Sequence, residues 1–230
     1  DRITIPLKQT KADKLWLLAH DNRSADLSGP YLEKIKKECK KLGVELKVEY
    51  SDRLSLFKAI KSIKDIIEKE KNNYIYVNVA SGSKIQAIAC MMACMVLKGC
   101  DNLQPFYAEP ESYAAFEGKQ QSFGLKDTIP LPTYEIQTPK PKLLAALKIV
   151  SEQKNQKITK KEMAQIAEDQ EIITVNAEES NHSQARFASL DKNIIAPLEK
   201  EWKFIEIEKI GRNRWIKITQ EGKDAAEFLI

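Results

Sequence analysis

Hydrophobic and polar residues follow two different patterns in the first half of the chain. Short apolar runs, typical of buried strands, are separated by longer segments in which apolar residues recur every three or four positions, as in amphipathic helices. Residues 55–71 show the helical pattern best, with apolar side chains at 56, 57, 60, 63, 66 and 67. The pattern predicts strands at 2–7, 14–19, 44–50, 74–79 and 103–108, and helices at 30–41, 55–71 and 84–98.

Strands that alternate with helices predict an α/β fold, here a Rossmann-like parallel sheet domain over residues 1–138. In such sheets, ligands bind beyond the carboxyl ends of the strands. One connection does not fit, because only six residues separate Leu7 from Lys14 and a parallel crossover needs about a dozen. The two strands are antiparallel, or the first is an edge strand, or a segment is omitted; we favour an omitted loop and helix.

The pattern changes after a proline-rich stretch that contains one more possible strand, at 131–137. Thr138-Pro139-Lys140-Pro141 marks a domain boundary, so we expect a second domain over residues 139–230. Three helices are predicted there, at 142–151, 160–168 and 181–192, with Thr159 as a cap and Pro197 as a kink or restart. Strands at 204–207 and 215–218 flank a basic turn, and Thr219 begins a last helix. This order predicts a C-terminal winged helix-turn-helix domain.

A small-residue turn follows the strand at 74–79 and leads into the next helix. Backbone N–H groups at such a helix start attract anions, serine hydroxyls add donors and lysine adds a charge. The turn is neither G-x-x-x-x-G-K-[ST] nor G-x-G-x-x-G, and it could serve only to begin a helix. The candidate ligand-binding residues are Asn78, Ala80, Ser81, Gly82, Ser83 and Lys84. Asn78 contacts the ligand or braces the turn.

In a winged helix, the third helix enters the major groove and the hairpin lies along the DNA backbone. We expect Ser183, Gln184 and Arg186 to face base edges, and Arg212, Arg214 and Lys217 to contact phosphates. Four acidic residues near the hairpin oppose DNA: Glu199, Glu201, Glu206 and Glu208. A winged helix that binds only proteins is therefore the alternative.

Composition narrows the class of protein only a little. The formal charge of +4 neither demands nor excludes a nucleic-acid partner, and 43% hydrophobic residues suffice for a sizeable core. The cysteines are Cys39, Cys90, Cys94 and Cys100; they show no zinc spacing and no disulfide framework. No apolar run is long enough to span a bilayer. We expect a reduced, cytoplasmic protein with no membrane partner and no metal.

The combination of motifs resembles the CRISPR-associated Rossmann fold (CARF) regulators, closest to their archaeal transcription-regulator-like branch. The segments that carry the resemblance are 76–85 (Tyr-Val-Asn-Val-Ala-Ser-Gly-Ser-Lys-Ile), Met91–Met95, Tyr107 with Glu109-Pro110-Glu111, Leu190-Asp191, Pro197–Glu199, Gly211-Arg212 and Ile218-Thr219. The usual family turn is Thr-Gly-Gly-Thr-Lys, so Ser-Gly-Ser-Lys departs from it. The resemblance implies a homodimer with a shared pocket, an effector ligand that is a cyclic oligoadenylate, with cyclic tetra-adenylate the expected one, and no other cofactor.

Three functions follow as hypotheses. The first is a transcriptional regulator that binds double-stranded DNA in response to a cyclic oligonucleotide. The second is a metal-independent ring nuclease, in which Lys84 and Ser83 stabilise developing charge and His20 is the nearest base. The third is a CARF-like DNA-binding or scaffold protein that has lost its ligand.

Overall fold

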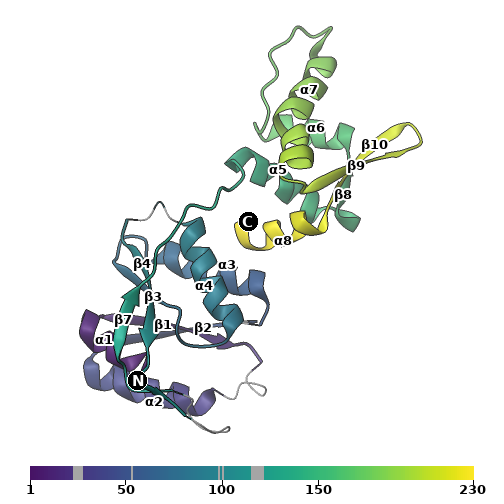
Figure 1. The fold of residues 1–230 in the computed structure, drawn as a ribbon. Helices are drawn as coiled ribbons and strands as arrows, with labels where there is room; N and C mark the ends of the chain where they lie inside the picture. The colour runs from purple at the N-terminus through teal and green to yellow at the C-terminus, as the bar shows by residue number, and fades with distance from the viewer. Residues whose placement is uncertain (23–27, 53, 98, 100, 115–121) are drawn as a thin grey trace. The chain divides into compact units, whose positions relative to one another are not determined.

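The computed structural model describes residues 1–22, 28–52, 54–97, 99, 101–114 and 122–230. Its contacts divide the chain into two compact units, Asp1–Gln137 and Thr138–Ile230, which are described separately (Figure 1). Lys98, the last residue of one predicted helix, and Cys100 lie outside the described residues.

The first unit is an α/β fold, as predicted. Its helices and strands alternate up to β4 and end in short strands. The helices are α1 (Thr4–Thr10), α2 (Gly29–Leu42), α3 (Leu56–Lys69) and α4 (Lys84–Val96); the strands are β1 (Lys14–His20), β2 (Glu45–Ser51), β3 (Ile75–Asn78), β4 (Leu103–Glu109), β5 (Ser112–Tyr113), β6 (Ser122–Phe123) and β7 (Asp127–Pro130).

The strand predicted at residues 2–7 is wrong, because this segment forms helix α1. The alternation of Ile3, Ile5 and Leu7 is typical of a strand, but Pro6 is the better signal. Proline has no N–H for a sheet ladder, whereas the first turn of a helix accepts it. Pro6 and Leu7 are both buried in α1. A helix before β1 also removes the difficulty of the short connection, since no parallel crossover is needed there.

The parallel pairing expected of the fold occurs in two ladders. β1 pairs with β2 in parallel, with Lys14 opposite Glu45. β3 pairs with β4 in parallel, and β7 adds to β4 in antiparallel orientation. The strand predicted at 131–137 is wrong, since β7 ends at Pro130 and no strand is assigned in that stretch, all of which is described. Pro132 has no N–H to extend the ladder, which explains the end of β7.

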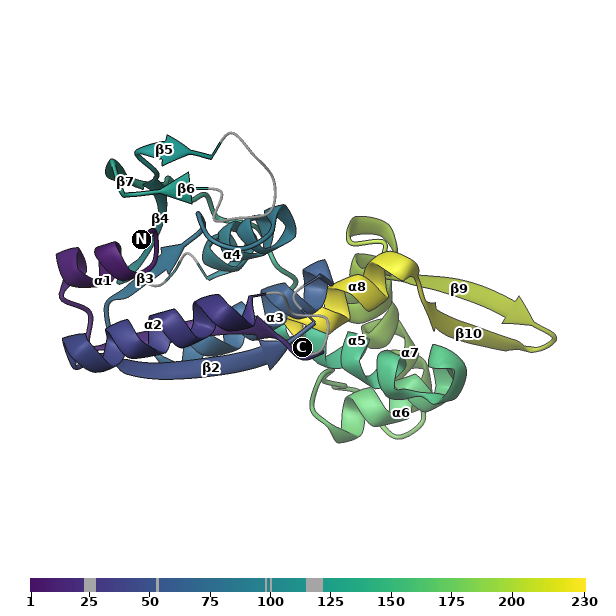
Figure 2. The ribbon, with the colours of Figure 1, turned by 90° about the horizontal axis from the view of Figure 1, so that it is seen from below.

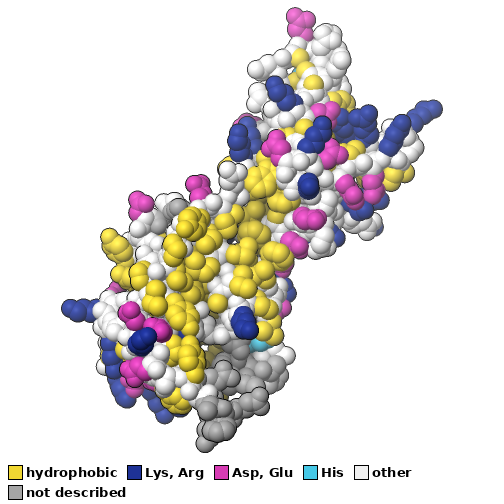
Figure 3. Space-filling model, viewed as in Figure 1, with side chains coloured by type: hydrophobic (Ala, Val, Ile, Leu, Met, Phe, Trp, Pro, Cys, Tyr) yellow, Lys and Arg dark blue, Asp and Glu magenta, His cyan; other side chains and the backbone are white. Residues whose placement is uncertain are grey.

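Helix α3 packs against α4, and the two supply much of the core of this unit. The fully buried face of α3 carries Ile60 and Ile67, as the spacing of apolar residues predicts, and α4 buries Ala89, Ala93 and Cys94. Two large apolar side chains of α4 stay at the surface, since Ile85 is 37% and Ile88 is 52% exposed. Hydrophobic side chains gather over this region in Figure 3.

The second unit has the winged-helix order of elements. It contains α5 (Pro141–Glu152), β8 (Lys157–Thr159), α6 (Lys160–Asp169), α7 (His182–Leu190), β9 (Ile205–Ile210), β10 (Asn213–Ile218) and α8 (Gln220–Leu229). The sheet order is β8-β10-β9, all antiparallel, and the β9–β10 hairpin extends from the helices (Figure 2). The predicted caps are confirmed: Thr159 Oγ1 accepts from Glu162 N at 3.2 Å and Thr219 Oγ1 from Gly222 N at 3.0 Å.

The third helix of this unit is longer than predicted. Two wide, π-helical turns, Asp191–Ile195 and Pro197–Glu201, continue it beyond α7. Pro197 has no N–H to donate within the helix, which accounts for an irregular turn rather than a break. Leu190, Ile194 and Leu198 from this helix are buried in the core of the unit. We refer to residues 182–201 as the long helix.

Candidate functional site

The turn after β3 is built by a local network of hydrogen bonds. Ser83 is the N-cap of α4, and its Oγ accepts from Gln86 N at 3.3 Å. In return, Ser83 N donates to Gln86 Oε1 at 2.7 Å. This reciprocal capping box satisfies two of the N–H groups that a helix start leaves unpaired. The buried Gln86, which the sequence did not single out, therefore holds the turn from within the helix.

Gly82 allows the backbone to make this turn. Its φ of +90° lies in a region that residues with a side chain rarely adopt. A Cβ atom at this position would also overlap the amide group of Gln86. Glycine is thus required here both by the backbone conformation and by the close approach of the capping side chain.

Asn78 braces the turn, which is one of the two roles considered for it. Its Oδ1 accepts from Ala80 N at 2.9 Å, and its Nδ2 donates to Arg2 O at 2.8 Å. Both ends of the amide are therefore engaged within the protein. The side chain fixes the end of β3 to the start of the chain.

A cluster that the sequence analysis missed lies beside this brace. Arg2 Nε donates to Ala108 O of β4 at 2.8 Å, and the guanidinium carbon lies 5.2 Å from the centre of the Tyr107 ring. The hydroxyl groups of Tyr107 and Tyr113 are 3.3 Å apart. Arg2 was overlooked because its segment was predicted to be a strand. The cluster brings a cation and two aromatic rings to the carboxyl ends of β3 and β4.

The six predicted ligand residues therefore divide into two groups. Asn78, Ala80 and Ser83 are engaged in the network that shapes the turn. Gly82 and Lys84 are exposed and Ser81 is half-buried. In the part of the chain that the structure describes, no hydrogen bond or ion pair holds the side chains of Ser81 and Lys84. These groups leave donors and one positive charge available to an anion.

The segment after β1 is separate from this turn in the described contacts. His20 Nδ1 lies 2.8 Å from Asp21 Oδ1, and Asn22 N donates to the same oxygen at 2.7 Å. The backbone hydrogen bond from Asn22 is the main cause that lowers the pKa of Asp21. Within the described residues, nothing brings His20 against Ser83 or Lys84, as a general base would require.

In the second unit, the predicted base-reading residues on α7 differ in their surroundings. Ser183 and Gln184 are exposed. Arg186 is held against α6 instead, with its Nη1 bonded to Gln165 Oε1 and 3.1 Å from Glu168 Oε2. Glu168 also lies 3.0 Å from His182 Nε2. With an 18% exposed side chain, Arg186 packs between two helices, in conflict with the outward orientation expected of it.

The basic residues of the hairpin also differ in whether a carboxylate neutralises them. Arg212 and Arg214 are exposed near the hairpin tip, where Gly211 has a φ of +61°. Lys217 lies 2.9 Å from Glu206 and 3.0 Å from Glu208 across the sheet. The hydrogen bonds that Lys217 donates to these two carboxylates raise its pKa to about 12. The acidic residues near the hairpin thus oppose a phosphate contact at Lys217.

Among the described residues, we find little support for a reactive thiol, a metal site or a membrane-spanning helix. Burial raises the pKa of Cys90 to about 11 and that of Cys94 to about 12, so both thiols are unreactive. No group of three or more potential metal ligands occurs among the described side chains. None of the described helices is both long and apolar enough to cross a membrane.

Comparisons with known proteins match the two units separately. Residues 1–113 match the family model described as "HFX_2341_N:-like, N-terminal", and residues 142–230 match "DUF6293 C-terminal winged helix domain". A similar curated protein is uncharacterized protein MJ1513 of Methanocaldococcus jannaschii, which is 26% identical over 207 residues. The match covers 78% of this chain and 62% of that protein, so the chain spans less than two thirds of its relative.

Among solved structures, Can2 from Sulfobacillus thermosulfidooxidans in complex with cyclic tetra-adenylate is similar over 97% of this chain and 59% of that chain, with 12% identity and a TM-score of 0.39. That similarity is too distant to carry an argument. The two family models account for the units on either side of the linker. Residues 1–113 of the α/β unit therefore resemble the N-terminal domain of the first family, and residues 142–230 resemble the DUF6293 C-terminal winged helix domain.

Proposed function

We propose that the protein is a DNA-binding regulator that responds to an anionic cyclic oligonucleotide bound at the turn after β3. The observation that carries the proposal is the set of available donors at Ser81, Gly82 and Lys84, at the carboxyl end of a strand in a parallel pair. The capping box and Asn78 fix these donors in place before any ligand arrives. Preorganised donors bind an anion without the entropic cost of ordering the loop.

The resemblance to CARF regulators suggests a cyclic oligoadenylate as the ligand, with cyclic tetra-adenylate as the first compound to test. Its ring of phosphates suits the lysine and the backbone N–H groups. Its adenine bases suit the neighbouring Arg2–Tyr107–Tyr113 cluster, because bases stack on aromatic rings and on guanidinium planes. We infer that the phosphates contact the turn and that a base contacts this cluster.

The proposal includes a homodimer. Helix α4 begins at the turn and leaves Ile85 and Ile88 exposed. Pairing two copies through this surface would bury those side chains, which is favourable at about 25 cal/mol per Å². It would also place two turns near each other for a symmetric ligand. Ile88→Glu should then lower the mass measured by light scattering from dimer to monomer, whereas Tyr31→Glu on α2 should not.

The winged helix domain supplies the proposed DNA-binding activity. Ser183 and Gln184 on α7, and Arg212 and Arg214 on the hairpin, are exposed and are the proposed contacts. Arg186 is set aside as a direct contact, because α6 already holds it. Ligand binding regulates DNA binding only if the two conformations of the dimer differ in affinity for the ligand.

The test is a calorimetric titration with cyclic tetra-adenylate, followed by DNA binding with and without it. Lys84→Ala should weaken ligand binding at least tenfold, while Lys37→Ala, an exposed lysine on α2, should leave it unchanged. Equal DNA affinity with and without ligand would refute the regulatory coupling. Analysis of the recovered ligand for linear product tests the alternative of a ring nuclease, and absence of ligand binding favours the scaffold alternative.

A further inference from the structure

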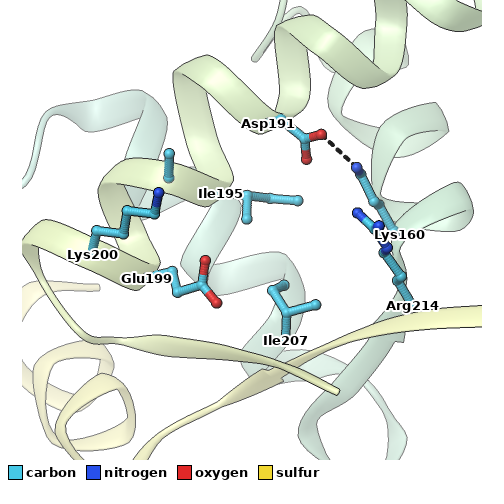
Figure 4. A pocket seen from close by; sticks show the side chains of 8 residues that line it. Lys160, Asp191, Ile195, Glu199, Lys200, Ile207 and Arg214 are labelled. Atoms are coloured by element: carbon cyan, nitrogen blue, oxygen red, sulfur yellow. Dashed lines mark hydrogen bonds and ion pairs between the residues drawn. The ribbon is translucent and has the colours of Figure 1, made fainter. Parts of the chain in front are cut away.

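A cavity of about 320 Å³ lies within the winged helix domain, between α6, the long helix and the β9–β10 hairpin. Charged side chains converge on it from all three elements, above an apolar floor (Figure 4). The lining residues are Lys160, Asp191, Ile195, Ala196, Glu199, Lys200, Ile207 and Arg214. The cavity lies on the two elements, long helix and hairpin, that winged helices present to DNA.

Lys160 is a fixed cation in this cavity. It is the first residue of α6, and its side chain is only 14% exposed. Its Nζ lies 2.6 Å from Asp191 Oδ2 and 5.6 Å from the centre of the Phe187 ring. An ammonium group has three N–H donors, so one carboxylate does not exhaust it.

Arg214 adds a second cation to this cavity. It lies two and four residues before the buried Ile216 and Ile218 on β10, so its side chain shares their face of the strand, the inner face of the hairpin. In Figure 4 its guanidinium group extends toward Lys160. No hydrogen bond or ion pair engages Arg214 among the described residues. Lys160 and Arg214 converge near Asp191, and an anion that enters between these two cations is attracted by both.

We propose that this cavity holds a phosphate group, and that the group comes from the backbone of double-stranded DNA. The guanidinium fork of Arg214 matches two phosphate oxygens, and Lys160 adds a point charge. Ile195 and Ile207 exclude water on one side, which strengthens both interactions. The source of the phosphate rests on the proposed DNA-binding function. Free phosphate would supply the same chemistry, and the experiment below separates the two sources.

Replacing Glu199 should tighten phosphate binding, whereas replacing a cation of the cavity should weaken it. Glu199 lines the cavity on the side away from Lys160, and no described contact neutralises it. Its negative charge opposes an incoming phosphate. Glu199→Gln should therefore tighten binding, while Glu201→Gln, which removes an exposed charge from the same helix outside the cavity, should have a smaller effect.

The first measurement is the affinity of the full chain for duplex DNA over a range of salt concentrations. Arg214→Gln should weaken binding about tenfold at low salt and reduce the slope of log K against log salt by about one. Lys223→Gln, an exposed lysine on α8, should change affinity less than twofold. Glu199→Gln should tighten binding about two- to threefold. If Arg214→Gln changes DNA affinity no more than Lys223→Gln, and Glu199→Gln no more than Glu201→Gln, the cavity does not hold a DNA phosphate.

The second measurement follows backbone NMR signals of the protein during titration with inorganic phosphate at constant ionic strength. Saturable shifts at Asp191, Ile207 and Arg214 that disappear in Arg214→Gln support a phosphate site even if the protein binds no DNA. This separates failure of the inference from failure of the proposed function. If phosphate causes saturable NMR shifts but the variants do not change DNA affinity, the site binds free phosphate and not DNA. No saturable shift and no variant effect on DNA binding overturn the inference.

Discussion

The turn after β3 and the cavity in the winged helix domain are both proposed anion sites, but they are assembled in different ways. The turn is held mainly by local hydrogen bonds of Asn78, Ser83 and Gln86, with one bond from Asn78 to the distant Arg2. The cavity joins Lys160, Asp191 and Arg214, which are far apart in sequence. The first depends on local backbone geometry, and the second depends on which cations the fold leaves without a carboxylate partner.

The comparison predicts that ligand binding at the turn is most sensitive to a substitution that alters its backbone conformation. Gly82→Val forces a β-branched side chain into a positive φ and against the Gln86 amide, which should disrupt the capping box. We expect at least a 100-fold loss of cyclic tetra-adenylate affinity in calorimetry and a loss of about 1–3 kcal/mol in unfolding free energy. Gly99→Ala is the control, because a Cβ there meets nothing within 4 Å. Unchanged ligand affinity in Gly82→Val would show that the turn is not the binding site.

In the winged helix domain, replacing Arg186, which is already paired with Glu168, should lower the stability of the fold more than the affinity for DNA. Arg186→Met removes one of the two side chains that contact Glu168 and leaves His182 as the other, and we expect a loss of about 1–2 kcal/mol in urea denaturation. DNA affinity, measured where both proteins are folded, should fall less than threefold. Gln184→Ala, on the exposed face of the same helix, should lower DNA affinity more than threefold and leave the unfolding free energy nearly unchanged. A large loss of DNA affinity without destabilisation in Arg186→Met would mean that the side chain leaves α6 to reach DNA.

The capping boxes at Ser83 and Thr159 should differ in how their contributions to stability depend on pH. Hydrogen bonds from the Thr159 hydroxyl and backbone N–H lower the pKa of Glu162 below its ordinary value of 4.5. A carboxyl group with a lowered pKa in the folded state stabilises the fold above about pH 4.5 and loses this contribution as the pH falls through its folded pKa. Gln86 does not titrate, so the box at Ser83 has no such dependence.

Thr159→Ala and Ser83→Ala should each cost about 1 kcal/mol at pH 7. Hydrogen exchange of amides in α6 and α4 reports each domain separately. The deficit of Thr159→Ala should shrink below pH 4, and that of Ser83→Ala should stay constant. Glu162→Gln should remove the pH dependence, and a deficit of Thr159→Ala that does not vary with pH would contradict the assignment.

The smallest effect is expected at a hairpin cation that is already neutralised. Because Glu206 and Glu208 hold Lys217, Lys217→Gln should change DNA affinity less than twofold, in contrast to Arg214→Gln. Fluorescence anisotropy with one labelled duplex is sufficient to compare them. Equal losses in the two variants would mean that the hairpin binds DNA through its net charge rather than through Arg214.

Local signals made parts of the fold and site predictable. The apolar periodicity of residues 55–71 identified α3, the serine and threonine caps identified the starts of α4, α6 and α8, and Gly82 marked the turn. Residues 2–7 misled the prediction because Ile3, Ile5 and Leu7 satisfy a strand pattern, although Pro6 is better placed in the first turn of a helix. The Arg2–Tyr107–Tyr113 cluster was missed for the same reason.

Sequence alone determined most of the helices, the strands β1 to β4, the position of the turn and the winged-helix arrangement, because capping and periodicity act over a few neighbouring residues. Only the tertiary structure decided which cations are available, since an ion pair depends on how close distant segments come. The sequence predicted DNA contacts for all three of Arg186, at base edges, and Arg214 and Lys217, at phosphates. Carboxylates on a neighbouring helix and a neighbouring strand neutralise Arg186 and Lys217 and leave Arg214 exposed.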